Sequence, residues 1–328
     1  MTGNSSSYNR CGIVLAGGDG YRLKPFVHEL RGNSLPKQYV NIIGTRSMIE
    51  HAFARAEKVI PRERIFTVVN RDHLRHPEAE QQLSTRSAGT VVVQPENRDT
   101  FAGVLLPLMH ICKRYPGATV VVFPSDHYIV EEDLFVSYVD LALLAAEQDP
   151  SRVVLLGIEP DRPEPEYGYI LPDGELVNST PLYMREIQVF VEKPDATLAK
   201  GLIAQGGLWN TMVMVFNSDT MLELIHRLSP TMYAAFQDVL MAIGTRYERQ
   251  VVKSIYDRMK GMNFSEEVLQ PLALVRPFTL SVLPVSGVFW SDWGSKTRIV
   301  SSLKKTGNLN RLQGVSESLL FQIWSEAS

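Results

Sequence analysis

Short, continuously apolar segments rich in β-branched residues recur along the first half of the chain, and they constrain its fold more than any other feature. They are Ile13–Ala16, Ile65–Val69, Val91–Val93, Thr119–Phe123 and Val153–Leu156. Such segments are typical of strands buried on both faces, as in a parallel sheet. Three segments with helical spacing lie between them: Met48–Val59, Phe101–Arg114 and Asp133–Gln148. This alternation predicts βαβ units and therefore an α/β fold, a central sheet flanked by helices.

The pattern changes after Pro160, where strand and helix signals no longer alternate regularly. Tyr169–Leu171 and Met184–Glu192 predict a small antiparallel insertion around the turn at Asp173-Gly174. In chain order we then expect a helix at Asp195–Gln205, a strand at Leu208–Phe216, helices at Asp219–Leu228 and Met232–Ile243, and strands at Leu272–Val275 and Leu280–Pro284. No long linker divides the sequence. We expect a flexible tail over residues 1–10 and a single domain over 11–328, closed by C-terminal helices that include Leu319–Trp324.

The composition of the chain limits which binding partners and which cellular compartment we expect. The 328 residues are 45% hydrophobic, enough for a substantial core, and the formal net charge of −3 favours neither nucleic acid nor an anionic membrane. Cys11 and Cys112 are the only cysteines, so a disulfide framework or a cysteine-rich zinc cluster is excluded. No segment approaches the roughly 20 apolar residues of a membrane span, and the first residues lack a signal-peptide core. We expect a cytoplasmic protein, with a homo-oligomer left open.

A glycine-rich turn follows the first strand directly. Gly17, Gly18 and Gly20 would let the backbone approach a ligand and present N–H donors to it. The spacing fits neither a dinucleotide fingerprint, whose third glycine would stand at Leu23, nor a P-loop, which needs Gly-Lys-Ser/Thr. A glycine turn alone is weak evidence of function. Arg22, just after it, adds a cation suited to phosphate oxygens, and Lys37 adds a second.

Further short motifs follow the glycine turn along the chain. In order, the motifs are Leu15-Ala16-Gly17-Gly18-x-Gly20-x-Arg22-Leu23-x-Pro25, Pro36-Lys37-Gln38, Pro95-Glu96-Asn97-Arg98-Asp99-Thr100, Pro124-Ser125-Asp126-His127, Tyr167-Gly168-Tyr169-Ile170, Phe190-Val191-Glu192-Lys193-Pro194, Trp209-Asn210 and Trp290-Ser291-Asp292-Trp293-Gly294-Ser295. Taken together, they resemble the signature of sugar-1-phosphate nucleotidyltransferases, and the version with Gln38 is most similar to mannose-1-phosphate guanylyltransferases. They span about residues 11 to 300.

The resemblance implies a fold, a reaction and a set of site residues. The fold would be a Rossmann-like mixed, mainly parallel sheet of the nucleotide-diphospho-sugar transferase type. The reaction would be Mg²⁺-dependent attack of a sugar 1-phosphate, mannose 1-phosphate first, on the α-phosphorus of a nucleoside triphosphate, GTP favoured, with release of pyrophosphate. The implied residues are Ala16, Gly17, Gly18, Gly20, Arg22, Asn97, Arg98 and Thr100 for the nucleotide, Gly168, Glu192, Lys193 and Asn210 for the sugar phosphate, Arg22, Lys37 and Asp126 for catalysis, and Asp126 and Asp292 for the metal.

Asp126 can be placed from the residues as well. It lies just past the strand Thr119–Phe123, at the carboxyl edge where open α/β sheets bind ligands. Mg²⁺ favours one or two carboxylates together with phosphate oxygens and water. The alternative for an aspartate here is a cap on the following helix, and the resemblance favours the metal. The sugar phosphate arrives already ionised, so no strong general base is required.

Several positions depart from the resembled pattern. Thr211-Met212 stands where a glycine usually follows, Lys24 replaces a tryptophan, and Asp99 and Gly103 replace Asn and Pro. The loop between Pro25 and Pro36 is longer than usual. Because of these departures, the resemblance does not decide which sugar and which nucleotide base the protein would bind. We expect Met212→Gly to shift sugar preference or KM more than nucleotide affinity.

Three other functions stay open. One is the same reaction with another sugar 1-phosphate or another nucleoside triphosphate. A second is a non-catalytic relative that binds nucleotide sugars. A third is a glycosyltransferase that uses a finished nucleotide sugar, although such enzymes generally carry Asp-x-Asp and Ser125-Asp126-His127 offers one carboxylate.

Overall fold

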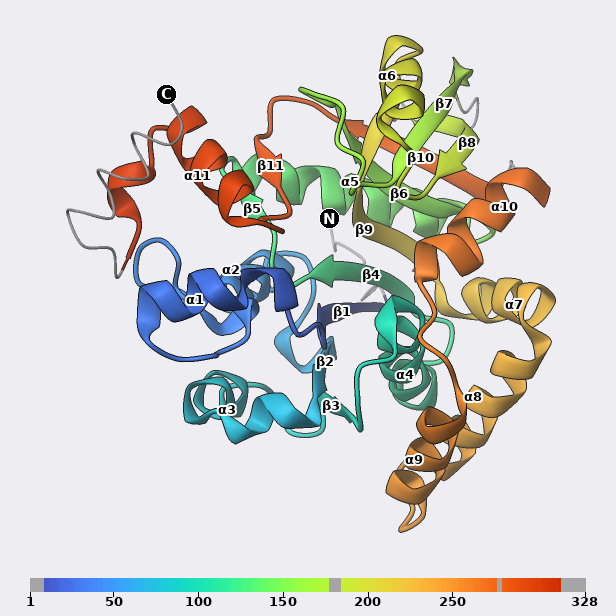
Figure 1. Cartoon of the computed structure of the whole chain (residues 1–328). Helices are drawn as coiled ribbons and strands as arrows, with labels where there is room; N and C mark the ends of the chain where they lie inside the picture. The colour runs from blue at the N-terminus through green and yellow to red at the C-terminus, as the bar shows by residue number, and fades with distance from the viewer. Residues whose placement is uncertain (1–8, 177–183, 276–278, 314–328) are drawn as a thin grey trace, which may run out of the picture.

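A nine-stranded mixed sheet forms the centre of the computed structural model, which describes residues 9–176, 184–275 and 279–313 (Figure 1). Its strand order is β3-β2-β1-β4-β9-β6-β10-β8-β7. The strands are β1 (Arg10–Ala16), β2 (Ile65–Asn70), β3 (Val91–Gln94), β4 (Thr119–Pro124), β6 (Val153–Ile158), β7 (Tyr169–Leu176), β8 (Arg185–Val191), β9 (Leu208–Asn217) and β10 (Leu280–Val285). The mixed α/β architecture expected from the alternation of strands and helices is confirmed.

The N-terminal half of this sheet is parallel. β1 pairs in parallel with β2 and β4, and β2 pairs in parallel with β3. Every residue of β2, β4 and β6 is buried, which accounts for their continuous apolar sequences. β9 then enters antiparallel between β4 and β6. The expected antiparallel pair is β7–β8, and β10 and β9 join it to the same sheet.

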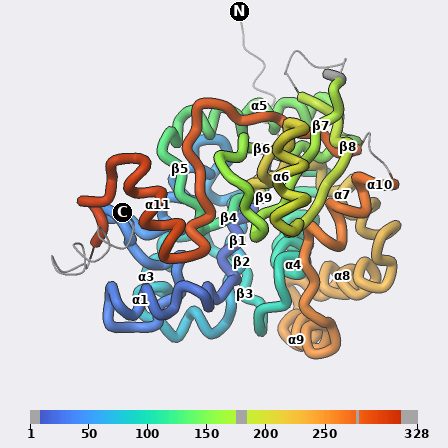
Figure 2. The backbone as a smooth tube through the Cα atoms, turned by 45° about the horizontal axis from the view of Figure 1, so that its top comes forward, coloured from blue at the N-terminus to red at the C-terminus, as the bar shows by residue number. Residues whose placement is uncertain are grey.

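Helices cover both faces of the sheet. They are α1 (Lys24–Arg31), α2 (Met48–Ala56), α3 (Pro77–Ser84), α4 (Asp99–Arg114), α5 (Glu132–Gln148), α6 (Ala196–Ala204), α7 (Ser218–Leu228), α8 (Pro230–Ala242), α9 (Glu248–Arg258), α10 (Gln270–Val275) and α11 (Lys296–Lys305). One hydrophobic cluster joins α2, α5 and α11, and a second joins α4, α7, α8 and α9. Figure 2 shows α8 and α9 beside α4, with α5 in another layer. No helix in the described ranges is long and apolar enough to cross a membrane.

Two expectations for local structure are wrong. Leu272–Val275 is not a strand but part of α10, with Leu272 buried while Leu274 is 77% exposed. A short apolar segment cannot by itself distinguish a strand from a helix. The segment between Pro25 and Pro36 is not simply a loop, because α1 begins with Pro25 in its first turn and ends at Gly32, which has a left-handed φ of 70°. Most of the N-terminal tail and Leu319–Trp324 lie outside the described residues.

A second, two-stranded sheet brings distant parts of the chain together at the carboxyl edge. β5 (Tyr128–Ile129) follows β4 and pairs antiparallel with β11 (Trp290–Ser291). This pairing places the segment after Asp126 beside the segment before Asp292. In Figure 1, α11 correspondingly lies beside α1, and Lys296 Nζ is 3.1 Å from a carboxylate oxygen of Glu29. The motifs that contain Asp126 and Asp292, which are far apart in the sequence, therefore lie together at this edge of the sheet.

Candidate active site

The glycine turn is held in shape by the buried side chain of Gln38. Gln38 Nε2 donates to the carbonyls of Ala16, at 2.8 Å, and Gly18, at 2.9 Å. A Cβ atom added to Gly17 would lie 2.3 Å from Gln94 Nε2, so a larger residue there would require the Gln94 side chain to move. These contacts fix the backbone of the turn before any ligand binds.

A cavity of about 240 Å³ opens beside this turn. The predicted nucleotide-site residues Gly17, Gly18, Gly20, Asn97 and Thr100 line it together with Asp126. Three residues expected to contact the nucleotide, Ala16, Arg22 and Arg98, do not line this cavity.

Ala16 and Arg98 make contacts within the protein instead. The Ala16 carbonyl accepts the hydrogen bond from Gln38. The guanidinium of Arg98 donates to the Tyr256 carbonyl at 3.0 Å and to Glu96 at 2.7 Å, and Arg98 does not line the cavity. Its contact with Tyr256 ties the segment before α4 to α9, so its role in the structure is to shape the wall.

Lys37 joins the two segments that carry the predicted metal ligands. It is 5% exposed, and its ammonium lies 2.8 Å from Asp126 Oδ2, 2.9 Å from the Asp292 carbonyl and 3.1 Å from the Trp293 carbonyl. Burial alone would raise the pKa of Asp126, but the charge of Lys37 and a smaller effect of His127 hold that pKa below its usual value. Asp126 is therefore ionised at neutral pH beside the cavity.

His127 is held as a neutral side chain. Burial lowers its pKa to about 4 despite the nearby carboxylates. The indole Nε1 of Trp290 donates to His127 Nδ1 at 3.2 Å, which leaves the imidazole proton on Nε2. We therefore assign His127 no proton-transfer role at neutral pH.

Asp292 is tightly held by its neighbours. Its Oδ1 accepts from the Tyr167 hydroxyl at 2.7 Å and from the backbone N–H of Gly294 at 3.0 Å, and Arg298 Nη2 donates to Oδ2 at 3.2 Å. A Cβ atom on Gly294 would lie 2.5 Å from Asp292 Oδ2, so a larger residue there would displace this carboxylate. Oδ2, with a single donor, is the oxygen with capacity left for another partner.

These residues fit a Mg²⁺ ion that a phosphate would help to hold. Among the described residues no group of three or more His, Cys, Asp or Glu side chains could hold a metal ion alone. Mg²⁺, however, usually keeps several waters and needs only one or two carboxylates besides substrate phosphates. Asp126, ionised and 37% exposed at the cavity wall, meets that requirement, and the Asp292 segment lies next to it through Lys37.

Arg22 does not line the cavity, and its side chain does not contact Asp126. It is 59% exposed and forms an ion pair with Glu166. Glu166 in turn lies 2.6 Å from Arg298, the residue that also holds Asp292. The predicted phosphate-binding arginine and the predicted metal ligand are therefore linked through a chain of alternating charges. Glu166 and Arg298 belong to this site but carry no signal in the sequence that marks them.

The predicted sugar residues converge at the ends of three neighbouring strands. Tyr169 of β7 pairs with Val191 of β8 and with Trp209 of β9. The adjoining residues Gly168, Glu192 and Asn210 therefore meet, and we call them the sugar cluster. Asn210 N–H donates to the Gly168 carbonyl at 2.8 Å, and a Cβ on Gly168 would lie 2.6 Å from Glu192 Oε2. Lys193, half exposed, lies 3.1 Å from Glu192 Oε1.

Sequence reasoning missed two residues that support this cluster. Gln270 Oε1 accepts from the backbone N–H of Glu192 at 3.1 Å, and Ser265 Oγ lies 3.2 Å from the sulfur of Met212. Ser265 begins a π-helical turn, Ser265–Leu269, of a kind that is rare and often found at functional sites. No local sequence pattern predicts a π-helical turn, so the contacts of Gln270 and Ser265 could not be predicted.

Strained backbone is concentrated around the site. In the described ranges the non-glycine residues with positive φ are Asp99 at 65°, Met212 at 56°, Lys193 at 47° and Trp293 at 46°. Asp99 and Met212 line the nucleotide cavity, Lys193 adjoins the sugar cluster, and the Trp293 carbonyl binds Lys37. Such angles cost roughly 1–3 kcal/mol each and persist where function requires them. Met212 thus adopts an angle that glycine would accept freely, and its N–H donates to Asn210 at 3.1 Å.

We expect Glu192→Gln to stabilise the free protein while weakening substrate binding. Burial raises the pKa of Glu192, only partly offset by Lys193, so ionisation of this carboxyl destabilises the folded state. That cost is absent below the ordinary glutamate pKa and is complete above the raised one. The melting temperature of the variant should therefore exceed that of the wild type at pH 7, and the difference should vanish at low pH. A thermal-melt series across pH measures this, and equal melting temperatures at pH 7 would contradict it.

Comparison with known proteins shows the family to which the chain is similar. The sequence profile described as "Nucleotidyl transferase" matches residues 11–307. The Xanthan biosynthesis protein XanB of Xanthomonas campestris pv. campestris is 33% identical over 305 residues, and Mannose-1-phosphate guanylyltransferase 2 of Escherichia coli O157:H7 is 27% identical over 316 residues. These matches cover 92% and 90% of this chain, but in both cases only 61% of the relative, so the chain spans about three fifths of their length.

A solved structure from Thermus thermophilus, named as a mannose-1-phosphate geranyltransferase, is similar over most of the chain. It shares 27% sequence identity and a TM-score of 0.71, covering 87% of this chain and 76% of that one. The profile match extends over far more than half of the residues and contains the glycine turn, Asp126, the sugar cluster and Asp292. The chain belongs to the nucleotidyl transferase family.

Proposed function

We propose that the protein transfers the guanylyl group of GTP to mannose 1-phosphate, giving GDP-mannose and pyrophosphate, in the presence of Mg²⁺. One observation carries the proposal: the glycine turn and Asp126 line one cavity, and Met212 joins that cavity to the sugar cluster. Both substrates could therefore bind with their reacting phosphates close together. The choice of GTP and mannose 1-phosphate draws support from relatives named as mannose-1-phosphate guanylyltransferases.

In the proposed mechanism the residues align and neutralise phosphates and move no proton. The sugar phosphate oxygen is already ionised when it attacks the α-phosphorus, so catalysis rests on position and charge. Glu192 and Asn210 would hold sugar hydroxyls, and Lys193, whose ammonium is half exposed, would hold the sugar phosphate. Gly17, Gly18 and Gly20 would present backbone N–H groups to the nucleotide.

Arg22 and Asp126 would act on opposite ends of the triphosphate. Arg22 would exchange its exposed ion pair with Glu166 for the β- and γ-phosphates, a small loss because exposed pairs contribute only about 0–1 kcal/mol. Lys37 would keep Asp126 ionised and in place. Asp126, with Asp292 as the second ligand, would hold Mg²⁺, which when bound supplies positive charge at the phosphate oxygens.

A pyrophosphate-release screen tests the proposal. Each of four nucleoside triphosphates is combined with mannose, glucose and heptose 1-phosphates in the presence of Mg²⁺. We expect the highest kcat/KM for GTP with mannose 1-phosphate. Release only with another pair would keep the reaction class and replace the substrates. No release from any pair, with nucleotide binding retained, would favour a non-catalytic relative, and transfer from GDP-mannose to an acceptor would favour a glycosyltransferase.

The same reaction with another sugar 1-phosphate or nucleotide is the second candidate. The observation in its favour is that three of the positions that depart from the resembled pattern, Met212, Asp99 and Gly103, line the nucleotide cavity. Good discrimination between bases requires donors and acceptors placed for one edge. Met212 lines this cavity and also contacts Asn210. The structure therefore widens the expectation from the sequence, which was mainly of an effect on the sugar: we expect Met212→Gly to alter KM for the nucleotide as well as for the sugar phosphate.

A further inference from the structure

The consecutive helices α8 and α9 form a hairpin whose surface carries a groove of about 640 Å³. The residues that line this groove lie on the two helices and on the segment 243–247 that joins them. Figures 1 and 2 both show the hairpin on the side of the molecule away from α1 and α11. None of the residues assigned above to the nucleotide, the sugar phosphate or the metal lines the groove, so it is a surface distinct from the candidate active site.

Large apolar side chains are exposed along this groove. Met241 is 73% exposed and Tyr247 is 50% exposed, whereas Ala242 and Ile255, which also line it, are buried. Within the described part of the chain, no element covers Met241 or Tyr247. Methionine and tyrosine are enriched in protein interfaces, and an apolar groove between helices fits a helix of a partner protein. The groove therefore has the composition of a protein-docking surface.

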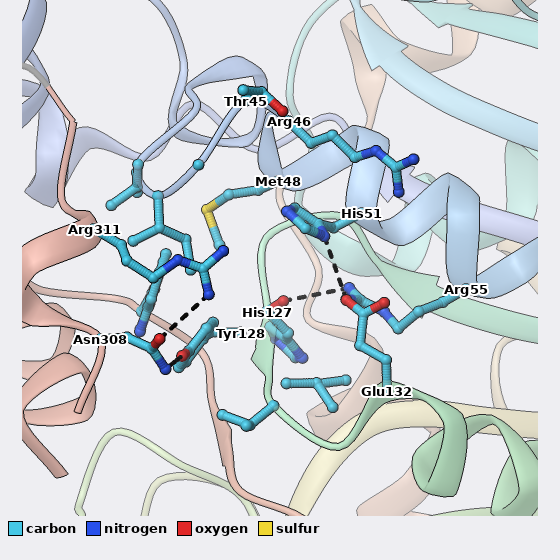
Figure 3. Close-up of a pocket in the computed structure, with 16 residues that line it drawn as sticks. Thr45, Arg46, Met48, His51, Arg55, His127, Tyr128, Glu132, Asn308 and Arg311 are labelled. Carbon is cyan, nitrogen blue, oxygen red and sulfur yellow. Dashed lines mark hydrogen bonds and ion pairs between the residues drawn. The ribbon is translucent and has the colours of Figure 1, made fainter. Parts of the chain in front are cut away.

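The same groove carries one acid and one base that lack partners of opposite charge. Asp238 of α8 and Arg258 of α9 both line it and are exposed. In the part of the chain that the structure describes, neither forms an ion pair, and Arg258 Nε donates to the Ser254 carbonyl of its own helix at 2.9 Å. The cavity drawn in Figure 3 differs, because its acid Glu132 is paired with Arg55 at 3.0 Å.

A second copy of this chain offers the matching pattern of charges. When two identical surfaces meet across a two-fold axis, residue i of each copy contacts residue j of the other. Asp238 of one copy can then pair with Arg258 of the other, and the same pair forms again across the axis. A partner carrying charge of one sign would match only one of these two residues. The charges therefore favour a second copy over an acidic or a basic partner.

We propose that the chain forms a homodimer through the α8–α9 groove, and that the dimer strengthens nucleotide binding. Met241 and Tyr247 become buried in the interface, and Asp238 of each copy pairs with Arg258 of the other. The dimer stands independently of any reaction, whereas the effect on nucleotide binding rests on the proposed function.

Helix α9 connects the groove to the nucleotide cavity. Ile255 and Arg258 of this helix line the groove, whereas Tyr256 is buried against the opposite wall. The Tyr256 carbonyl accepts from Arg98 at 3.0 Å, and its hydroxyl lies 3.4 Å from Gln94 Oε1. Gln94 lines the nucleotide cavity. An interface that fixes α9 also fixes this wall, so dimer formation and nucleotide binding are coupled.

Sedimentation equilibrium of the full chain and of two charge-reversal variants tests the dimer. We expect the wild type to be dimeric. Asp238→Arg and Arg258→Asp should each weaken self-association at least about tenfold, because each variant places like charges opposite one another twice. An equal mixture of the two variants should recover the dimer, since each interface pair of the mixed dimer again joins an arginine and an aspartate.

A matched control and an uncharged variant complete the experiment. Lys253→Asp reverses a charge on the same helix, at a position that is 59% exposed and lies outside the groove, and should associate like the wild type. Tyr247→Ala should weaken association at least about fivefold, because exposed tyrosines often anchor interfaces. A monomeric wild type, charge-reversal variants or a Tyr247→Ala variant as tightly associated as the wild type, a weakened control, or a mixture no tighter than its components would each overturn the dimer.

Titration calorimetry with GDP as the probe tests the effect on the nucleotide. Each charge-reversal variant alone should bind GDP at least about fivefold more weakly than the mixture, which is the lower end of typical coupling between sites. Equal affinity, or no binding, would overturn this effect. An absence of GDP binding in every sample would also count against the proposed function, while sedimentation still decides the dimer, so the two failures are distinguishable.

Discussion

Replacement of Asp126 by alanine is expected to lower turnover by at least ~10²-fold, the scale of losing a major electrostatic stabiliser. Asp126 is the ionised carboxylate that faces the nucleotide cavity, and Lys37 holds its pKa low. Removing it leaves the phosphates without the ligand that would position Mg²⁺ against them. Single-turnover kinetics at saturating GTP and mannose 1-phosphate separate this loss of chemistry from weaker binding.

Asp133→Ala provides the matched control for that experiment. Asp133 is 94% exposed, forms a surface ion pair with Lys58 at 2.6 Å and does not line the nucleotide cavity. Its removal should leave turnover unchanged. Near-normal rates for Asp126→Ala at saturating Mg²⁺ would remove this residue from the metal site and would leave Asp292 as the candidate.

Lys37→Met is expected to lower both stability and turnover. The substitution keeps most of the side-chain volume but removes an ammonium that binds one carboxylate and two carbonyls. Breaking a fully buried pair costs about 3–5 kcal/mol, and because Asp126 keeps 37% of its surface exposed we expect a smaller loss, about 1–3 kcal/mol of unfolding free energy. Denaturant titration measures it, and turnover should fall at least ~10-fold because the segments of Asp126 and Asp292 lose their common partner.

Lys58→Met is the control, since it makes the same chemical change at the exposed pair with Asp133. Exposed pairs contribute about 0–1 kcal/mol, so stability should hardly change. A Lys37→Met variant no less stable than Lys58→Met would contradict the assignment of Lys37 as the link between the two segments.

The parallel core of the fold can be predicted because a strand buried on both faces must be apolar at every position. The continuous β-branched segments of β2, β4 and β6 show this pattern. The amphipathic helices α4 and α5 are likewise predicted to within a few residues of their observed bounds. Where an element is short or buried on one side only, the sequence pattern is ambiguous. The sequence of α10 therefore predicts a strand, because four consecutive apolar residues fit either a strand or a helix.

The candidate site can be predicted in part for a similar reason. Gly17 and Asp126 follow strands directly, so their place at the carboxyl edge follows from the topology. The ion pairs of Glu166 and Arg298, the contact of Gln270 with Glu192 and the angle of Met212 depend on tertiary packing. The periodicity of the sequence does not predict these contacts, nor does it predict that Arg22 points toward Glu166.

A crystal structure of the protein with Mn²⁺ and a non-hydrolysable GTP analogue tests the central claim most directly. We expect one nucleotide against Gly17 and Gly18, an anomalous metal peak bound to the Asp126 carboxylate at about 2.0–2.2 Å, and Arg22 turned from Glu166 to the terminal phosphates. A nucleotide bound elsewhere, or one that Asp126 reaches while Arg22 remains paired with Glu166 on a different side of the sheet, would contradict the proposed active site.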